Sequence, residues 1–292
     1  MTVKTSDEKQ QRSETSIDYD KLEKRNLLGK GVTAVEITPN IGTEIRGIQL
    51  SSLNSAQRDD LALLAAERGV VIFRHQDFAD IGPERQRELG AHFGALHVHQ
   101  MGGHIKDYPE ILPVYRDFVS NAVDNEISNN VPPSGGDTLY LSTTAAYNHL
   151  STDFRDRISG LTATHSGFSQ AAVSDHRDRY IREPIETAHP VIRTHPVTKA
   201  KSLYVNRLYT RKIVGWKEEE SQALLGFLYD HIEKGQDWHL RVHWTPGTVV
   251  VYDNRVTQHS ALRDYKVQEA STRRHMIRIT PQAERPYLEK PE

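Results

Sequence analysis

Short apolar runs separated by polar stretches fill the N-terminal half of the chain and predict alternating strands and helices. Val70 to Phe73 is a continuous apolar run of the kind found in buried strands. A helix from Asn54 to about Arg68 precedes this run, because apolar residues recur there at helical spacing and Gly69 follows as a stop signal. A second helix begins at Pro83, since proline suits the first position of a helix.

Three further segments of this half have shorter or weaker patterns. Val32 to Leu50 alternates weakly and contains two glycines, which favours two short strands joined by a turn. Leu96 to His99 is expected to form another short strand. Pro132 to Asp137 is a strong turn signal that leads into a strand over Thr138 to Leu141.

The C-terminal half has the clearest patterns. Glu218 to Glu233 carries leucine and isoleucine at helical spacing and predicts the most regular helix of the chain. Trp238 to Trp244 alternates apolar and polar residues, so one face of this strand is expected to be buried. Further strands are expected over Thr248 to Tyr252 and Arg274 to Thr280. The other predicted elements are two short helices and the two arms of a hairpin, over Thr143 to His149, Asp153 to Ile158, Val191 to His195 and Ser202 to Asn206.

Many short strands with a few flanking helices indicate a mixed α+β fold that is mainly β and forms a distorted double-sheet barrel. Residues 1–28 are polar and charged, and we expect a flexible tail there. Residues 29–292 are then a single domain, which is a plausible size for one core. The charged stretch from Ser169 to about Glu186 is expected to be an insertion or lid.

Composition narrows the classes of function. The 37 Lys+Arg and 39 Asp+Glu residues nearly balance, so nothing indicates a nucleic-acid partner. No apolar run is long enough to span a membrane, and the N-terminus lacks the apolar core of a secretory signal. With no cysteine, disulfides and thiolate metal sites are excluded, which favours a cytoplasmic protein. Any transition metal would be bound by nitrogen and oxygen, and the chain has 15 histidines.

Candidate chemistry gathers near the C-terminus. The expected strand ending at Tyr252 is followed by a polar turn, then by His259, a loop, and the strand that begins at Arg274. Side chains alternate along a strand, so Arg274 and Arg278 share one face. Two buried arginines are costly unless anions pair with them, although a solvated strand face is the ordinary alternative. An isolated histidine such as His259 is likewise more often a surface residue than a metal ligand.

The order of these residues resembles one family. Asp253 to His259, followed by Arg274 to Arg278, is similar to the taurine dioxygenase family of Fe(II)/2-oxoglutarate-dependent oxygenases. The resemblance extends from about Val32 to Tyr287, and it implies a double-stranded β-helix, or jelly-roll, core. Three more segments carry it: Phe93 to His99, Gly135 to Leu139 and Arg193 to Val197.

The resemblance implies a role for five residues. His259 matches the distal histidine of the family's two-histidine, one-carboxylate iron site. Arg274 matches the arginine that pairs with the far carboxylate of 2-oxoglutarate, and Thr138 matches the hydroxyl that assists it. Arg278 and His99 match the groups that hold the substrate sulfonate. The implied reaction oxidises a small anionic substrate while 2-oxoglutarate becomes succinate and CO2.

One part of the family pattern is absent. The other two iron ligands are expected on a His-X-Asp or His-X-Glu motif ahead of Gly135, but the chain runs through Asn130 into Val131 without it. A segment on the order of 20 residues, containing one core strand, is therefore missing relative to the family. The same spacing occurs elsewhere by chance and is not expected to bind iron, at His75 to Asp77, His176 to Asp178 and His231 to Glu233. Possible substitutes are His97, His99, Asp124, Glu126 and Asp137.

Three hypotheses follow. The gene could encode a complete oxygenase through a coding segment that this sequence lacks, as with an incomplete gene model. The shortened chain could instead be inactive and bind 2-oxoglutarate or sulfonates through Arg274 and Arg278. A different metal enzyme, such as a hydrolase built on His97, His99 and His259, is disfavoured. The first hypothesis is favoured as an account of the chain's ancestry. The second is favoured as an account of how this chain behaves. A lost strand would also expose sheet edges and favour a homo-oligomer.

Overall fold

The computed structural model describes residues 26–99, 105–116, 131–132, 134–168, 183–265 and 274–289. Most of the expected tail, residues 1–25, lies outside this part, as does the greater part of the charged stretch before Glu186. The described chain opens with a short 3-10 helix, η2 (Asn26–Leu28), whose Leu27 is fully buried in the core. Leu27 falls within the expected tail of residues 1–28, yet it packs in the core of the folded domain.

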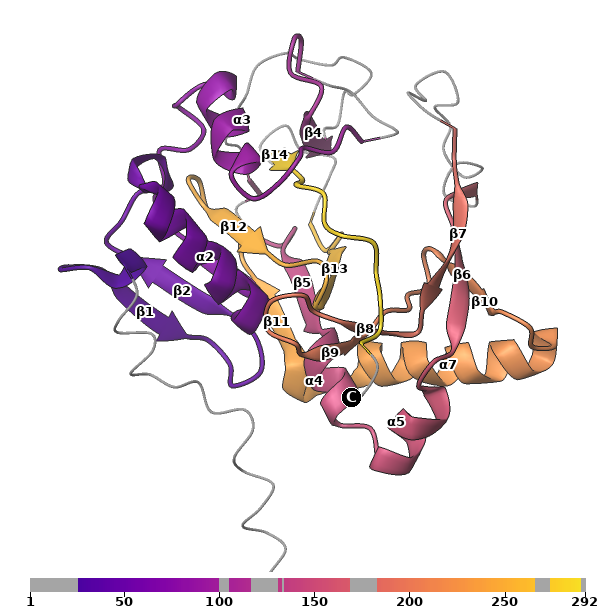
Figure 1. Cartoon of the computed structure of the whole chain (residues 1–292). Coiled ribbons are helices and arrows are strands. Elements are labelled where there is room, and N and C mark those ends of the chain that lie inside the picture. Colours follow the sequence, from indigo (N-terminus) through magenta and orange to yellow (C-terminus); the bar gives the residue numbers. More distant parts are fainter. Residues whose placement is uncertain are drawn as a thin grey trace, which may run out of the picture.

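The N-terminal part forms a helix on a sheet, as its apolar pattern predicts. Four strands are arranged in the order β1-β2-β3-β12, and α2 (Ser55–Arg68) packs against this sheet (Figure 1). A capping box between Asn54 and Gln57 begins α2, and Gly69 ends it with a positive φ of 74°. The strands are β1 (Thr33–Glu36), β2 (Thr43–Arg46), β3 (Val70–Phe73) and β12 (Val249–Tyr252).

A second sheet stands at the centre, in the order β11-β5-β13. It contains β11 (His239–Val242), β5 (Thr138–Ser142) and β13 (Thr257–Ala261), all antiparallel. The sequence predicts β5 and β11, and the buried residues of β11 are the predicted ones, Leu240 and Val242. It does not predict β13, so His259 lies within a strand rather than between a turn and a loop.

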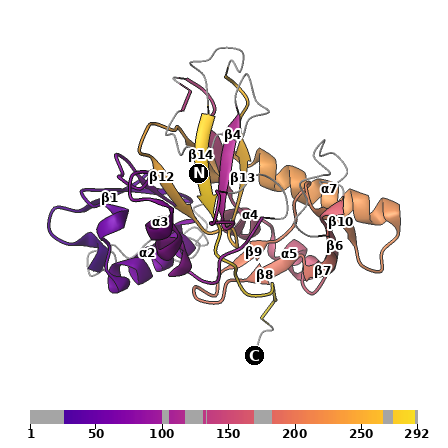
Figure 2. The ribbon, with the colours of Figure 1, turned by 90° about the horizontal axis from the view of Figure 1, so that it is seen from above.

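The two arginines lie on a separate ladder. β14 (Arg274–Ile279) pairs antiparallel with β4 (Ile111–Arg116), and the two strands run side by side in Figure 2. The strand predicted over Leu96 to His99 is wrong, because only Leu96 makes a bridge, to Pro281. The backbone bonds of this segment are isolated ones to residues beyond the end of β14, from His97 to Thr280 and from Gln282 to Ala95, and they form no continuous ladder.

The long helix α7 (Glu218–Lys234) lies along one side of the molecule (Figure 1). Its apolar face, including Leu225 and Leu228, packs in the largest core cluster. The predicted hairpin is present as β8 (Ile192–Thr194) and β9 (Lys201–Leu203). A three-stranded sheet has the order β10-β6-β7, and the other elements are β6 (Thr162–Ser166), β7 (Glu186–Pro190), β10 (Thr210–Ile213), α3 (Pro83–Ala91), α4 (Thr143–Asn148), α5 (Thr152–Ile158), η3 (Leu50–Ser52) and η5 (Gln236–Trp238).

The fold is thus mixed, with most of its elements strands. Within the described residues, β12, β13 and β14 each end their own sheet. None of the helices described is both long and apolar enough to cross a bilayer. Among the residues described, these three edges have no further strand partner, and an edge of this kind can pair with another chain.

We expect the open edge of β13 to promote self-association of the purified protein. Ser260 on β13 is exposed, and Ser260→Lys places a charge at this edge that disfavours pairing with a second strand. Size-exclusion chromatography with light scattering should show oligomers for the wild type and a shift toward monomer for S260K. Gln222→Lys, on the exposed face of α7, should leave the oligomers unchanged. A monodisperse wild-type monomer would contradict the prediction.

A pair of half-buried histidines makes the fold sensitive to acid. His165 on β6 and His189 on β7 lie with ring centroids 5.2 Å apart, and His165 stacks on Tyr204 at 5.3 Å. Burial, together with His189 and Arg211, lowers the pKa of His165 to about 4. The Nε2 atom of His165 is buried without a hydrogen-bond partner in the described part of the chain. Both observations favour the neutral ring.

We expect the protein to lose stability as the pH falls from about 6.5 to about 4. The unfolded chain protonates His165 near 6.5, whereas the folded chain resists protonation until about 4, so acid favours unfolding. The full effect is about 3 kcal/mol, and less where solvent reaches the ring. Urea unfolding at several pH values should show a smaller acid dependence in His165→Gln than in the wild type. His75→Asn, at an exposed position, should keep the wild-type dependence, and equal slopes in all three proteins would refute the assignment.

Candidate functional site

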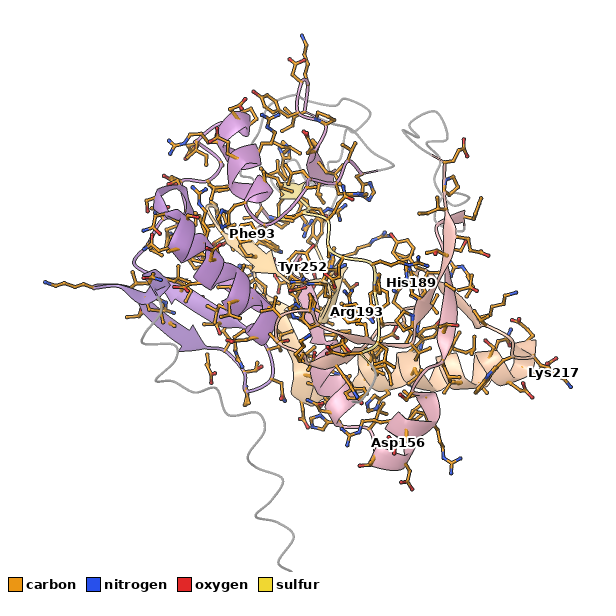
Figure 3. The ribbon with its side chains drawn as sticks, viewed as in Figure 1. Phe93, Asp156, His189, Arg193, Lys217 and Tyr252 are labelled. Carbon is orange, nitrogen blue, oxygen red and sulfur yellow. The ribbon has the colours of Figure 1, made fainter. Side chains whose placement is uncertain are left out.

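Three rings from three strands, those of His259, Tyr140 and Tyr252, lie against one another. His259 on β13 stands opposite Tyr140 on β5, and their ring centroids are 5.7 Å apart. Tyr252, at the end of β12, lies 5.0 Å from His259 and 5.2 Å from Tyr140. Figure 3 shows Tyr252 in the middle of the molecule. The antiparallel register of β5 and β13 therefore builds one wall of the candidate site.

His259 is suited to be a neutral ligand. Part of its side chain is exposed to solvent, yet enough protein surrounds the ring that desolvation lowers its pKa. The positive charge of Arg278 lowers the pKa further. A neutral imidazole keeps a lone pair that can accept a hydrogen bond or bind a metal.

Arg274 is a buried cation held by neutral groups. Its side chain is 6% exposed, and its Nε donates a hydrogen bond to the carbonyl oxygen of Gly136 at 3.0 Å. One terminal nitrogen donates to Oγ1 of Thr138 at 3.4 Å. Desolvation lowers the pKa of Arg274, and no carboxylate among the described residues forms an ion pair with it. A bound anion would supply the missing counter-charge.

Thr138 has one hydrogen-bonding function left. Its Oγ1 accepts from Arg274 and also from the indole Nε1 of Trp244 at 3.0 Å. A hydroxyl has two acceptor sites and one donor, so the Thr138 proton remains available to an acceptor atom of a ligand. Thr138 and Arg274 can therefore both donate to one carboxylate.

Arg278 lies on the same strand face as Arg274 and near the aromatic rings. Burial raises the pKa of Tyr252, and the positive charge of Arg278 opposes this rise. The same charge lowers the pKa of His259. Its Nε is buried and has no hydrogen-bond partner in the ranges described. The Arg278 side chain thus has unused donor capacity.

The segment that carries His99 runs beside the end of β14. Leu96 bridges Pro281, and the backbone nitrogen of His97 donates to the carbonyl oxygen of Thr280 at 2.8 Å. The His97 and His99 rings are 6.2 Å apart and both are half-buried. The chain therefore approaches the Arg278 end of β14 at His99.

The described residues do not provide an iron site. No group of three histidine or acidic side chains in them could hold a metal ion. Asp137, a possible substitute ligand, is instead bound by Arg241 Nε at 2.5 Å and by His243 Nδ1 at 2.9 Å. Asp124 and Glu126 lie outside the described residues. His259 alone does not meet the needs of iron, which binds three protein ligands in the family's site.

The other histidine–acid pairs have structural partners. Asp77 accepts a hydrogen bond from Ser51 at 2.7 Å. His231 contacts the carbonyl oxygen of Ala146 at 2.8 Å, and Glu233 pairs with Arg207. The pair at His176 and Asp178 lies outside the residues described.

Tyr140, Tyr252 and Trp244 belong to this site although their sequence pattern does not predict it. Tyr140 and Tyr252 converge only through strand pairing, which the local pattern does not contain. Trp244 was expected to fill a buried strand face, but it lies beyond the end of β11 and orients Thr138.

Comparison with known proteins identifies relatives along most of the chain. The model of the family "Taurine catabolism dioxygenase TauD, TfdA family" matches residues 33–130 and 127–280. The two matches meet at residues 127–130, ahead of the turn that leads into β5.

Two curated fungal proteins are similar over nearly the whole chain. The alpha-ketoglutarate-dependent dioxygenase cnsM of Penicillium expansum is 40% identical, over 89% of this chain and 80% of that protein. The alpha-ketoglutarate-dependent sulfonate dioxygenase of Saccharomyces cerevisiae is 43% identical, over 86% of this chain and 67% of that protein.

Among solved structures, a putative alpha-ketoglutarate-dependent taurine dioxygenase from Burkholderia xenovorans has the same fold. Its TM-score is 0.72 at 27% identity, and the match covers 87% of this chain and 94% of that one. Sequence and structure thus agree with the resemblance carried by His259, Arg274 and Arg278, and the chain belongs to the TauD/TfdA family of taurine catabolism dioxygenases.

Proposed function

We propose that this chain, an Fe(II)/2-oxoglutarate-dependent dioxygenase by ancestry, binds 2-oxoglutarate at Arg274 and a small sulfonate-like anion at Arg278. The observation that carries the proposal is the buried Arg274 guanidinium, which is held by Gly136 and Thr138 and lacks a carboxylate partner in the described chain. Relatives that depend on alpha-ketoglutarate support this assignment.

The far carboxylate of 2-oxoglutarate would lie between Arg274 and Thr138. Arg274 supplies a positive charge and N–H donors, while Thr138 donates its hydroxyl proton because both of its acceptor sites are used. Burial strengthens the interaction, since little water screens the charges. Trp244 fixes the hydroxyl, so the ligand meets a group that is already oriented.

The anionic group of the substrate would bind at the other end of the same strand face. Arg278 has a buried Nε without a described partner, and the His99 segment borders that end of β14. A sulfonate presents three acceptor oxygens to such donors, and it is the substrate group in the printed name of the yeast relative. We therefore assign a small sulfonate or similar anion to this end.

Turnover would require iron ligands that the described residues lack. In the family the iron activates oxygen, and the protein's part is to orient both anions beside it. We propose that a strand of a jelly-roll core, bearing the His-X-Asp motif, is missing between Asn130 and Val131. The two-part family match, which meets at residues 127–130, and the unpaired edges of β12, β13 and β14 in the described chain support this proposal.

The favoured activity of the chain itself is thus anion binding without turnover, in the cytoplasm. A hydrolase built on His97, His99 and His259 is less well supported, because no cluster of three such ligands occurs in the ranges described. Such a hydrolase would hold a stoichiometric metal that is lost in His97→Ala.

Removing the Arg274 charge should abolish most of the 2-oxoglutarate binding. We expect the wild type to bind without added metal and Arg274→Gln to bind roughly 10- to 100-fold more weakly, since a charged hydrogen bond is lost. Isothermal titration calorimetry measures both affinities, and circular dichroism checks folding. Arg157→Gln, at an exposed position of α5, should bind like the wild type. A wild type that binds no 2-oxoglutarate refutes the proposal.

The purified chain should release no succinate from 2-oxoglutarate when it is given Fe(II), oxygen and short alkyl sulfonates. The reason is that His259 alone holds iron too weakly, and Arg274 and Arg278 repel the cation. Succinate is quantified by liquid chromatography, and clear turnover would show that the site is complete.

Transcript sequencing across the codons for Asn130 and Val131 tests the missing strand separately. An in-frame insertion that encodes a His-X-Asp motif is expected in a longer product, and that product should release succinate. Contiguous coding in genome and transcripts would contradict the missing-strand proposal.

A further inference from the structure

The strands that carry the proposed ligand-binding groups are not joined to each other by a backbone ladder. β13, with His259, pairs with β5, whereas β14, with Arg274 and Arg278, pairs with β4, and the described sheets share no strand. Contacts other than a shared ladder therefore set the distance between His259 and Arg278. The bonds from Arg274 to Gly136 and Thr138 provide one such tie, at the β5 side.

A second tie begins in the turn before β13. The Asp253 carboxylate accepts from the backbone nitrogen of Arg255 at 2.9 Å and from its guanidinium at 2.6 and 2.9 Å. The carbonyl oxygen of Asp253 accepts from Thr257 Oγ1 at 2.8 Å. Thr257 is the first residue of β13, so the Asp253 turn sets where the His259 strand starts.

His195 keeps Asp253 ionised and in place. The Nδ1 of His195 accepts from the backbone nitrogens of Val197 and Thr198 at 3.3 and 3.1 Å. The ring proton is therefore on Nε2, which donates to Asp253 Oδ2 at 3.1 Å. Burial alone would raise the pKa of Asp253, but the hydrogen bonds from His195 and Arg255 lower it well below its usual range.

Glu284 connects this turn to the segment that follows β14. One Glu284 oxygen accepts from Arg255 Nη1 at 3.2 Å, and the other accepts from Arg193 Nη2. Arg193 on β8 is 2% exposed and lies over the Tyr204 ring, in the middle of the molecule (Figure 3). Burial would raise the pKa of Glu284, whereas Arg193 and Arg255 lower it, so the carboxylate stays charged between two arginines.

We propose that Glu284 and Asp253 are positioning residues of the anion site, because they hold the His259 strand at a fixed distance from the strand that carries Arg274 and Arg278. This inference rests on the proposed function. The chain of contacts runs from His195 through Asp253 and Arg255 to Glu284 and Arg193. These contacts lie at the end of the site opposite the one where Arg274 bonds to Gly136 and Thr138. Removing one charged side chain from such a partly buried network is costly, because its partner is then left uncompensated.

The test compares Glu284→Gln with Glu289→Gln. Both glutamates lie in the C-terminal segment and each forms ion pairs, but Glu289 pairs with Lys199 at the surface. We expect E284Q to bind 2-oxoglutarate about tenfold more weakly than the wild type, and E289Q to bind normally. Titration calorimetry without metal, well below the unfolding temperature of each protein, reports the affinity of folded molecules only.

A double variant separates positioning from general destabilisation. If Arg255 and Glu284 act as one tie, the variant Arg255→Gln/Glu284→Gln should lose no more affinity than the more strongly affected single variant. Losses that multiply, or equal binding by the wild type and E284Q, would overturn the inference. A wild type that binds no 2-oxoglutarate would instead refute the proposed function. Should E284Q fail to fold, Glu284→Asp keeps the charge but is too short to bridge both arginines, and it is expected to show the same weakening.

Discussion

The buried charge of Arg274 is the constraint on which the site depends. A guanidinium out of water is costly unless its donors are used and its charge is compensated. Gly136 and Thr138 accept hydrogen bonds from the guanidinium, but no described carboxylate compensates its charge. The turn at Gly136, the start of β5 and the indole of Trp244 are all arranged around this cation. Gly136 itself has a positive φ of 68°, a conformation that glycine adopts without strain.

The described part of the same scaffold does not bring together three side chains that could hold a metal ion. The chain belongs to a family of iron enzymes, and its aromatic wall and its two arginines are present. In contrast, Asp137 is committed to Arg241 and His243, and the other described histidine–acid pairs have structural roles. The proposed anion-binding arginines and the expected metal ligand His259 therefore lie on different strands, β14 and β13.

Elements that have a strong local pattern of apolar residues can be predicted from the sequence. The helix α7, the buried strand β3 and the alternating strand β11 follow from periodicity within a few residues. β13 was not predicted, because Thr257 to Ala261 has no apolar alternation and becomes a strand only by pairing with β5. β4 contains Pro113, which argues against a strand, but as an edge strand it tolerates the missing donor. The candidate site residues follow from the resemblance of motifs, whereas their neighbours Tyr140 and Tyr252 come together by pairing between distant segments.

The hydrogen bond from Trp244 to Thr138 has an optical consequence. The chain has three tryptophans, and Trp238 donates its indole proton to Ile232 within the buried core. Trp244 is the tryptophan whose indole shares an oxygen atom with Arg274, so a negative charge at the arginine changes the field across that ring. An anion that bound at Arg274, as proposed, is therefore expected to change the fluorescence of Trp244.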